Sequence, residues 1–272
     1  MTETTRYRSH ARTYLLCPPE HFTVQYAINP WMDPDRPVDT ALAMRQWQQL
    51  AETFAGLGHT VHTIRPEPGL PDMVFAANGA TVIGGKVLGA RFRYPQRQPE
   101  AAAYLAWFAS QGYTQVAPTP TVNEGEGDIA YAGRAVLVGH GFRTDPAIAA
   151  QVSALFGLPT ITLRLVDPRF YHLDTALTVL DADTAAYYPA AFDDAGRAAL
   201  ASHFAELIEV KDEDAEVLGL NAISDGRNVV LPAQADGLAA QLSAAGFTPV
   251  RVDLSELLKA GGGPKCCTLE LR

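Results

Sequence analysis

DTALAMRQWQQLAETFAGLGHTVHTIRP, residues 39–66, couples a helix to a strand. Its apolar residues fall at helical spacing behind Asp39, which suits an N-cap, and a β-rich stretch begins at His59. The same order occurs five times along the chain. The five units cover residues 39–66, 98–118, 145–165, 193–212 and 235–254. This self-similarity predicts an α/β protein built from a repeated unit.

A second β-rich stretch follows each unit after a loop. Five residues mark where these stretches open: Asn78, Gly127, His172, Asn221 and Cys266. They are 49, 45, 49 and 45 residues apart. Four of the stretches run through a short turn into a third stretch, as in a hairpin. The sequence therefore predicts five ββαβ modules.

The fifth module stops after CCTLELR, residues 266–272, before a third strand can form. TYLLC, residues 13–17, has no partner of its own and could supply that strand. Such pairing closes a ring and removes exposed sheet edges. We therefore predict a five-bladed α/β propeller. An open Rossmann-like sheet is the alternative, and it is less favoured because no glycine-rich phosphate loop follows a first strand.

Composition describes an ordinary globular chain of 272 residues, a length that allows one large domain or two small ones, and we expect one domain over residues 1–272. The net charge of −9 disfavours nucleic acid and anionic membranes as partners and favours a cationic ligand. Three cysteines cannot form a disulfide framework, and the N-terminus lacks the apolar stretch of a signal peptide. We expect a cytoplasmic protein.

In a ring the five openings would face one centre, where a thiol, an imidazole and carboxylates would meet. Adjacent strand residues point to opposite faces, so only one of Cys266 and Cys267 should face this centre, whereas His172 and Asp174 would share a face. A zinc site is disfavoured, because adjacent cysteines lack the spacing of paired metal ligands. Several carboxylates around a thiol favour a cationic substrate over the neutral amide of a Cys–His acyl hydrolase.

Five motifs occur in a specific order along nearly the whole chain. They are LPDMVFAANGA (70–80), NEGEGD (123–128), GHGFRTD (139–145), HLDTALTVL (172–180) and GGGPKCCTLEL (261–271). This ordered set resembles the guanidino-group-modifying enzymes, or penteins. They include dimethylarginine dimethylaminohydrolase, arginine deiminase, arginine dihydrolase and the amidinotransferases. The fold of these enzymes is a five-bladed α/β propeller.

The resemblance implies a catalytic set of Cys266 as nucleophile, His172 as acid and base, and Glu124 as carboxylate. Glu126 stays open as an alternative to Glu124. Six further residues match substrate-binding positions: Asp72, Asn78, Asp174, Arg97, Arg143 and Asn29. The resemblance implies that Asp174 holds the guanidinium group and that the two arginines hold the α-carboxylate of the substrate.

The resemblance also implies covalent hydrolysis of the guanidinium C–N bond, with no metal or organic cofactor. A dimethylarginine hydrolase is expected first, with arginine dihydrolase, amidinotransferase and a non-catalytic arginine-binding protein as alternatives. The chain departs from dimethylarginine hydrolases and arginine deiminases at two positions. Those enzymes usually have a carboxylate where this chain has Asn78, and they often have glutamate where it has Ala77. This departure leaves the particular guanidine open. A homo-oligomer is compatible with the sequence.

Overall fold

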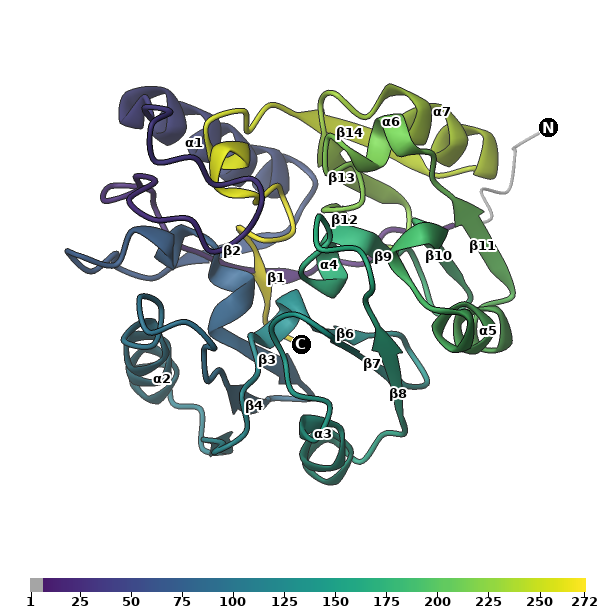
Figure 1. Ribbon diagram of the computed structural model, residues 1–272, viewed down its shortest axis with the longest axis horizontal. Helices are drawn as coiled ribbons and strands as arrows, with labels where there is room; N and C mark the ends of the chain where they lie inside the picture. Colours follow the sequence, from purple (N-terminus) through teal and green to yellow (C-terminus); the bar gives the residue numbers. More distant parts are fainter. Residues whose placement is uncertain (1–6) are drawn as a thin grey trace.

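The computed structural model describes residues 7–272, and within them five three-stranded sheets stand around a common axis, with helices outside (Figure 1). In each sheet the middle strand pairs antiparallel with one neighbour and parallel with the other. This is the predicted five-bladed α/β propeller of five ββαβ modules.

The strands have the following bounds, blade by blade. The first blade contains β15 (Leu269–Glu270), β1 (Thr13–Leu16) and β2 (Thr60–Thr63). The second contains β3 (Ala80–Ile83), β4 (Lys86–Gly89) and β5 (Val116–Ala117), and the third contains β6 (Ile129–Tyr131), β7 (Val136–His140) and β8 (Thr160–Arg164). The fourth contains β9 (Leu177–Val179), β10 (Thr184–Tyr187) and β11 (Glu206–Glu209), and the fifth contains β12 (Ile223–Ser224), β13 (Asn228–Pro232) and β14 (Thr248–Val252).

In every blade one helix connects the middle strand to its parallel partner. These helices are α1 (Thr40–Gly56), α2 (Glu100–Ser110), α3 (Ile148–Phe156), α5 (Asp194–His203) and α7 (Asp236–Ala245). The short helices are α4 (Leu173–Ala176), α6 (Asp212–Ala215), η1 (Pro71–Val74), η2 (Ala76–Gly79), η3 (Gly125–Gly127), η4 (Pro189–Ala191) and η5 (Leu257–Ala260). Within residues 7–272, no helix is long and apolar enough to cross a membrane.

Local sequence signals set the ends of several of these helices. The side chain of Asp39 accepts a hydrogen bond from the amide of Leu42, and Asp193 caps α5 in the same way through Gly196. Helix α3 ends at Gly157 and α7 ends at Gly246, both in the left-handed conformation that glycine adopts without strain. The predicted helix-to-strand units are therefore confirmed at their boundaries.

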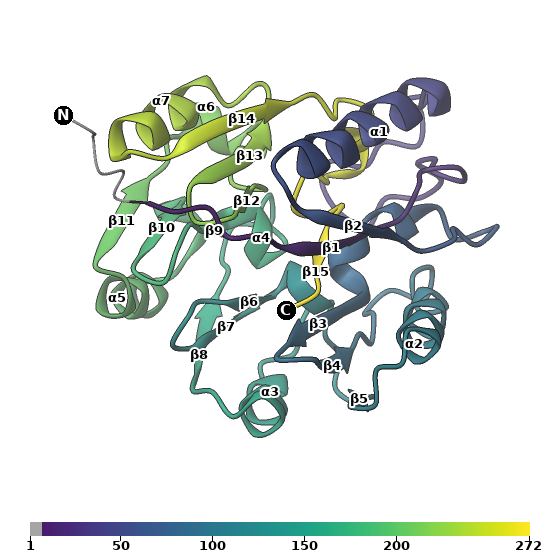
Figure 2. The same ribbon diagram turned by 180° about the vertical axis from the view of Figure 1, so that it is seen from behind.

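The ring closes between the two ends of the chain. Strand β1 pairs antiparallel with β15, with Tyr14 opposite Glu270 and Leu15 opposite Leu269, and parallel with β2. Figure 2 shows β1 and β15 near the centre of the molecule. The predicted pairing of residues 13–17 with the last module is confirmed. Leu15 is fully buried, so the closing strand also contributes to the core.

The openings of the second β stretches differ from the prediction, because they are turns and not strands. Asn78 lies in η2, Gly127 lies in η3, and His172 directly precedes α4, while Asn221 and Cys266 lie in turns before their strands. Strand alternation is therefore the wrong description of these positions. Two of their amides bond locally: those of Asn78 and Gly127 donate to the carbonyls of Phe75 and Glu124 at 3.1 and 3.2 Å.

Candidate active site

Cys266 lies buried on the turn that leads into β15. Its thiol donates to Oδ2 of Asp174 at 3.2 Å, and Nδ2 of Asn221 donates to its Sγ at 3.0 Å. Oδ1 of Asn221 accepts from the amide of Cys266 at 2.9 Å. Three modules thus meet at this sulfur: the last one carries it, and the two preceding ones hold it in place.

The surroundings keep the thiol neutral before a ligand arrives. Burial raises the pKa of Cys266 well above its ordinary value, and the neighbouring Asp174 raises it further. Burial also raises the pKa of Asp174, to about 7. A cation bound beside both groups would favour the thiolate and the carboxylate together, because an opposite charge stabilises an ionised form.

His172 and Glu124 form a buried pair next to this thiol-bearing turn. Nε2 of His172 lies 2.7 Å from Oε2 of Glu124, and Nη1 of Arg143 lies 2.7 Å from the same oxygen. Burial by itself would raise the pKa of Glu124, but Arg143 and His172 outweigh it and hold that pKa well below its usual range. Glu124 is therefore an ionised hydrogen-bonding partner that can orient His172.

The side chain of Glu126 points toward Lys265 and not toward His172. The structure thus distinguishes Glu126 from Glu124, the two candidates for the carboxylate beside the histidine. Its Oε2 lies 2.7 Å from Nζ of Lys265 and accepts from the amide of Glu270 at 3.0 Å. Glycine residues on both sides allow this sharp change of direction, since Gly125 has a φ of 55°. Only Glu124 of the pair bonds to His172.

Asp72 and Asn78 belong to one hydrogen-bonded group with Arg97. Oδ2 of Asp72 accepts from the hydroxyl of Tyr26 at 2.8 Å, and Oδ1 of Asn78 accepts from Nη1 of Arg97 at 2.8 Å. The Nε and Nη2 atoms of Arg97 donate to Glu100 at 2.9 and 2.8 Å. The amide of Asn78 therefore serves as an acceptor for a buried arginine in this structure.

The two arginines predicted to hold an α-carboxylate are bound to protein groups. Arg97 donates hydrogen bonds to Asn78 and Glu100. The Cζ atom of Arg143 lies 4.7 Å from the ring centroid of Tyr94 and 4.8 Å from that of Tyr171. Nη2 of Arg143 also donates to the carbonyl of Ile28 at 2.9 Å. Their contact with a substrate stays a prediction.

Residues 26–31 cover this set of side chains. Nδ2 of Asn29 donates to the carbonyl of Ala260 at 3.0 Å, and Nε1 of Trp31 donates to the carbonyl of Arg169 at 2.9 Å. Asn29 thus fastens the covering segment to the glycine-rich turn in this structure, and its contact with substrate stays a prediction. In this structure Cys266 is only 2% exposed.

Sequence reasoning left three residues of the site without a role. Asn221 was recognised as an opening residue, but its bonds to Cys266 depend on a turn from another blade. Asp128 closes the NEGEGD motif, and its Oδ1 accepts from the amide of Leu173 at 3.0 Å, which fixes the chain directly after His172. Tyr26 carries no sequence signal beyond its nearness to Asn29.

The three glycines before the cysteines allow the close approach of other segments. Gly261 has a φ of 83°, and the amide of Gly263 donates to Oδ1 of Asn221 at 2.9 Å. A Cβ atom on Gly262 would lie 2.1 Å from the ring of Phe75. These positions explain why glycine precedes the cysteine pair: side chains there would displace the turn that carries the thiol.

We predict that Gly262→Ala lowers the free energy of unfolding by about 1–3 kcal/mol, because the new methyl group overpacks a buried ring. Chemical denaturation measures this loss. Gly56→Ala is the matched control, since the last residue of α1 has no atom within 4 Å of a Cβ. Equal stability of the Gly262→Ala variant and the wild type would contradict the packing argument.

The arrangement offers a thiol, an imidazole paired with a carboxylate, and further carboxylates. These are the groups that cysteine-based covalent catalysis uses. Among residues 7–272, no three histidine, cysteine, aspartate or glutamate side chains are grouped in a way that could hold a metal ion.

Comparisons with known proteins agree on one family. The family described as "N,N dimethylarginine dimethylhydrolase, eukaryotic" matches residues 19–272. An N(G),N(G)-dimethylarginine dimethylaminohydrolase of Mycobacterium tuberculosis is 54% identical over 266 residues, which cover 98% of this chain and 88% of the relative. The bifunctional arginine dihydrolase/ornithine cyclodeaminase ArgZ of Synechocystis sp. is 35% identical over 263 residues, which cover 94% of this chain but 37% of ArgZ.

A solved structure confirms the fold at the same time. The N-terminal domain of an ArgZ variant, covalently bound to a reaction intermediate, matches with a TM-score of 0.92 at 34% identity. The match covers 96% of this chain and 98% of that domain. The chain therefore belongs to the dimethylarginine dimethylaminohydrolase family and has the pentein fold, as the resemblance of its motifs implied.

Proposed function

We propose that the protein hydrolyses asymmetric dimethylarginine to citrulline and dimethylamine through a covalent thiouronium adduct on Cys266. Family membership supports a hydrolase that acts on guanidino C–N bonds. One structural observation carries the proposal. Asp72 and Asp174 each keep a buried carboxylate oxygen with no hydrogen-bond partner among residues 7–272, and Asp174 touches the thiol. The N–H groups of a guanidinium cation would satisfy these acceptors by charge-assisted hydrogen bonds.

The proposed chemistry has two halves. With the cation bound, Cys266 releases its proton to solvent, and the thiolate forms a bond with the central guanidinium carbon. His172, protonated beside Glu124, gives a proton to the departing dimethylamine as its C–N bond breaks, which leaves the thiouronium adduct and a neutral imidazole. The imidazole then takes a proton from water as the water oxygen bonds to the same carbon. The C–S bond breaks and the proton of the added hydroxyl goes to the sulfur, so that citrulline leaves and the thiol is restored.

The binding of the rest of the substrate is part of the proposal. Arg97 and Arg143 would take the α-carboxylate, and Asn78 and Asn29 would contact the amino-acid portion. We also propose that residues 1–272 act as one catalytic domain without metal or organic cofactor. Action in the cytoplasm and assembly into a homo-oligomer stay predictions from the sequence.

Arginine dihydrolase activity is the second candidate, and Asn78 is the observation in its favour. This residue is an amide where dimethylarginine hydrolases usually have a carboxylate, and it bonds to Arg97 at 2.8 Å. The identity of 54% to a dimethylarginine dimethylaminohydrolase, against 35% to ArgZ, favours the first candidate.

A product assay distinguishes the candidates. We expect citrulline and dimethylamine from asymmetric dimethylarginine, detected by mass spectrometry, and slower or no turnover of arginine. Ornithine and ammonia from arginine would instead establish the dihydrolase. Turnover only after an amine acceptor is added would indicate an amidinotransferase, and tight arginine binding without product over hours would indicate a binding protein.

A further inference from the structure

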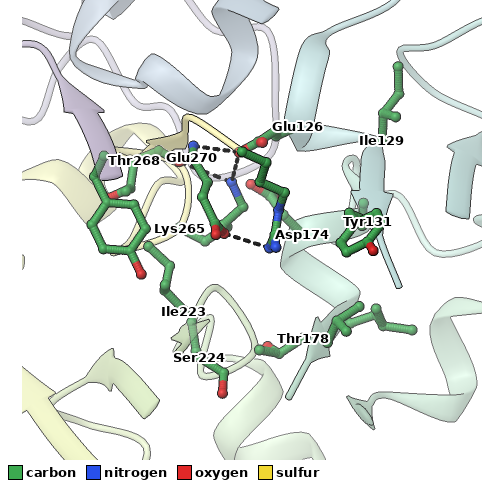
Figure 3. A pocket seen from close by; sticks show the side chains of 16 residues that line it. Glu126, Ile129, Tyr131, Asp174, Thr178, Ile223, Ser224, Lys265, Thr268 and Glu270 are labelled. Atoms are coloured by element: carbon green, nitrogen blue, oxygen red, sulfur yellow. Dashed lines mark hydrogen bonds and ion pairs between the residues drawn. The ribbon is translucent and has the colours of Figure 1, made fainter. Parts of the chain in front are cut away.

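Asp174 also lines a second cavity, which Figure 3 shows. Its Oδ2 accepts from the Cys266 thiol, yet the same residue lines a cavity to which neither Cys266 nor His172 contributes. Five of the sixteen residues that line this cavity are charged. Lys265, the residue directly before the nucleophile, is among them.

Lys265 forms one of the ion pairs in and beside this cavity. Its Nζ lies 2.7 Å from Oε2 of Glu126 and donates to the carbonyl of Thr268 at 3.0 Å. Glu270 forms two further ion pairs. Its Oε1 lies 3.5 Å from Nε of Arg12, and its Oε2 lies 2.5 Å from Nη2 of Arg272.

The charges in and beside this cavity balance. Three carboxylates, those of Asp174, Glu126 and Glu270, stand with three cations, Lys265, Arg12 and Arg272. Glu126 and Asp174 are buried, and the side chain of Lys265 is 20% exposed. Because these groups are largely shielded from water, the loss of one charge strongly changes the electrostatic energy of the others. Removal of Lys265 would leave three carboxylates against two guanidinium groups.

The groups that face Asp174 come from several segments. The turn before β15 carries three of them: Lys265, Cys266 and Cys267. Glu126 lies in η3, and Tyr171 lies three residues before Asp174 in the chain. Burial raises the pKa of Asp174 to about 7; the charge of Lys265 lowers it and that of Glu126 raises it. Lys265 is thus the cation that most favours the ionised form of Asp174.

We propose that Lys265 is a positioning residue for the reaction: from the far side of Asp174, it keeps that carboxylate ionised for binding of the cationic substrate, and Glu126 acts against it. Lys265 itself does not touch the substrate. The inference rests on the proposed role of Asp174 as a guanidinium ligand.

The sign of the effect follows from the protonation of Asp174. The ionised form binds the guanidinium, so binding is present above the pKa of Asp174 and is lost as the pH falls through it. Lys265→Met should move this loss to higher pH, and Glu126→Gln should move it to lower pH. At a pH well below the pKa of Asp174, a rise of that pKa by about 1 lowers the ionised fraction about tenfold.

The test compares pH profiles of kcat/KM for asymmetric dimethylarginine. We expect Lys265→Met to shift the acidic limb upward, with about a tenfold loss at pH 6.5 that is largely recovered at high pH. Lys265→Arg should keep the wild-type profile, and the Lys265→Met/Glu126→Gln double variant should return toward it. A loss of the same size at every pH, or shifts in the same direction for Lys265→Met and Glu126→Gln, would overturn the proposal.

A binding measurement separates this inference from the proposed reaction. Calorimetric titration of arginine into the Cys266→Ser variant, with and without Lys265→Met, follows guanidinium binding without turnover. The affinity should fall at a higher pH when Lys265 is absent. If the wild-type protein does not hydrolyse dimethylarginine, the proposed function is wrong. The titration still tests whether Lys265 affects guanidinium binding.

Discussion

We expect Cys266→Ser to reduce citrulline formation by on the order of 10³-fold or more, and Cys267→Ser to retain most of it. A serine hydroxyl is a far weaker nucleophile than a thiolate, and the Asp174 carboxylate beside it disfavours ionisation further. Cys267 is packed in the hydrophobic core with no role in the proposed chemistry. Steady-state assays of the two variants measure the difference.

Two controls make this result specific. Thermal denaturation of both variants tests folding, since a buried serine at either position costs about 1–3 kcal/mol without a hydrogen bond. Acid-quenched wild-type enzyme, digested and analysed by mass spectrometry, should carry the thiouronium adduct on the Cys266 peptide. Equal loss of activity in folded Cys266→Ser and Cys267→Ser proteins would refute the assignment of the nucleophile.

We expect His172→Ala to lower kcat by about 10²–10⁴-fold, the usual contribution of a positioned acid and base. Both halves of the proposed reaction depend on this residue, because the imidazole would protonate the leaving amine and then deprotonate water. Its buried bond to Glu124 at 2.7 Å holds the ring in place. Stopped-flow and steady-state measurements at several pH values report the loss.

The matched control is His62→Ala, which removes an exposed imidazole on β2. It should leave kcat close to that of the wild type. Glu124→Gln should fall between the two histidine variants, because the amide keeps a hydrogen-bonding group but removes the charge that stabilises protonated His172. A folded His172→Ala protein with near-normal kcat would exclude His172 as the acid and base.

Local patterns account for the success of the fold prediction. The helical spacing behind Asp39 and the left-handed glycines at Gly157 and Gly246 are readable without tertiary information. The period of the modules then shows that one strand is missing from the last, and residues 13–17 supply it. A repeat restricts the fold strongly because each module must bury its apolar face against its neighbours.

The same reasoning described the centre of the ring less well. It treated His172 and Cys266 as strand residues, although both lie in turns before a short helix or strand. Periodicity cannot distinguish a turn from a strand over so few residues. It also could not separate Glu124 from Glu126, because adjacent glycines let the two carboxylates point to different partners.

The sequence by itself determined the five modules, the closing strand and the types of side chain that the centre would hold. Only the tertiary structure decided which of these side chains touch: Asn221 and Asp174 at the sulfur, Glu124 at His172, and Glu126 at Lys265. The reason is physical. Secondary structure and repeats depend on neighbours along the chain, whereas the contacts at Cys266 and His172 join residues 45, 48 and 92 positions apart, and their directions depend on how all five blades pack.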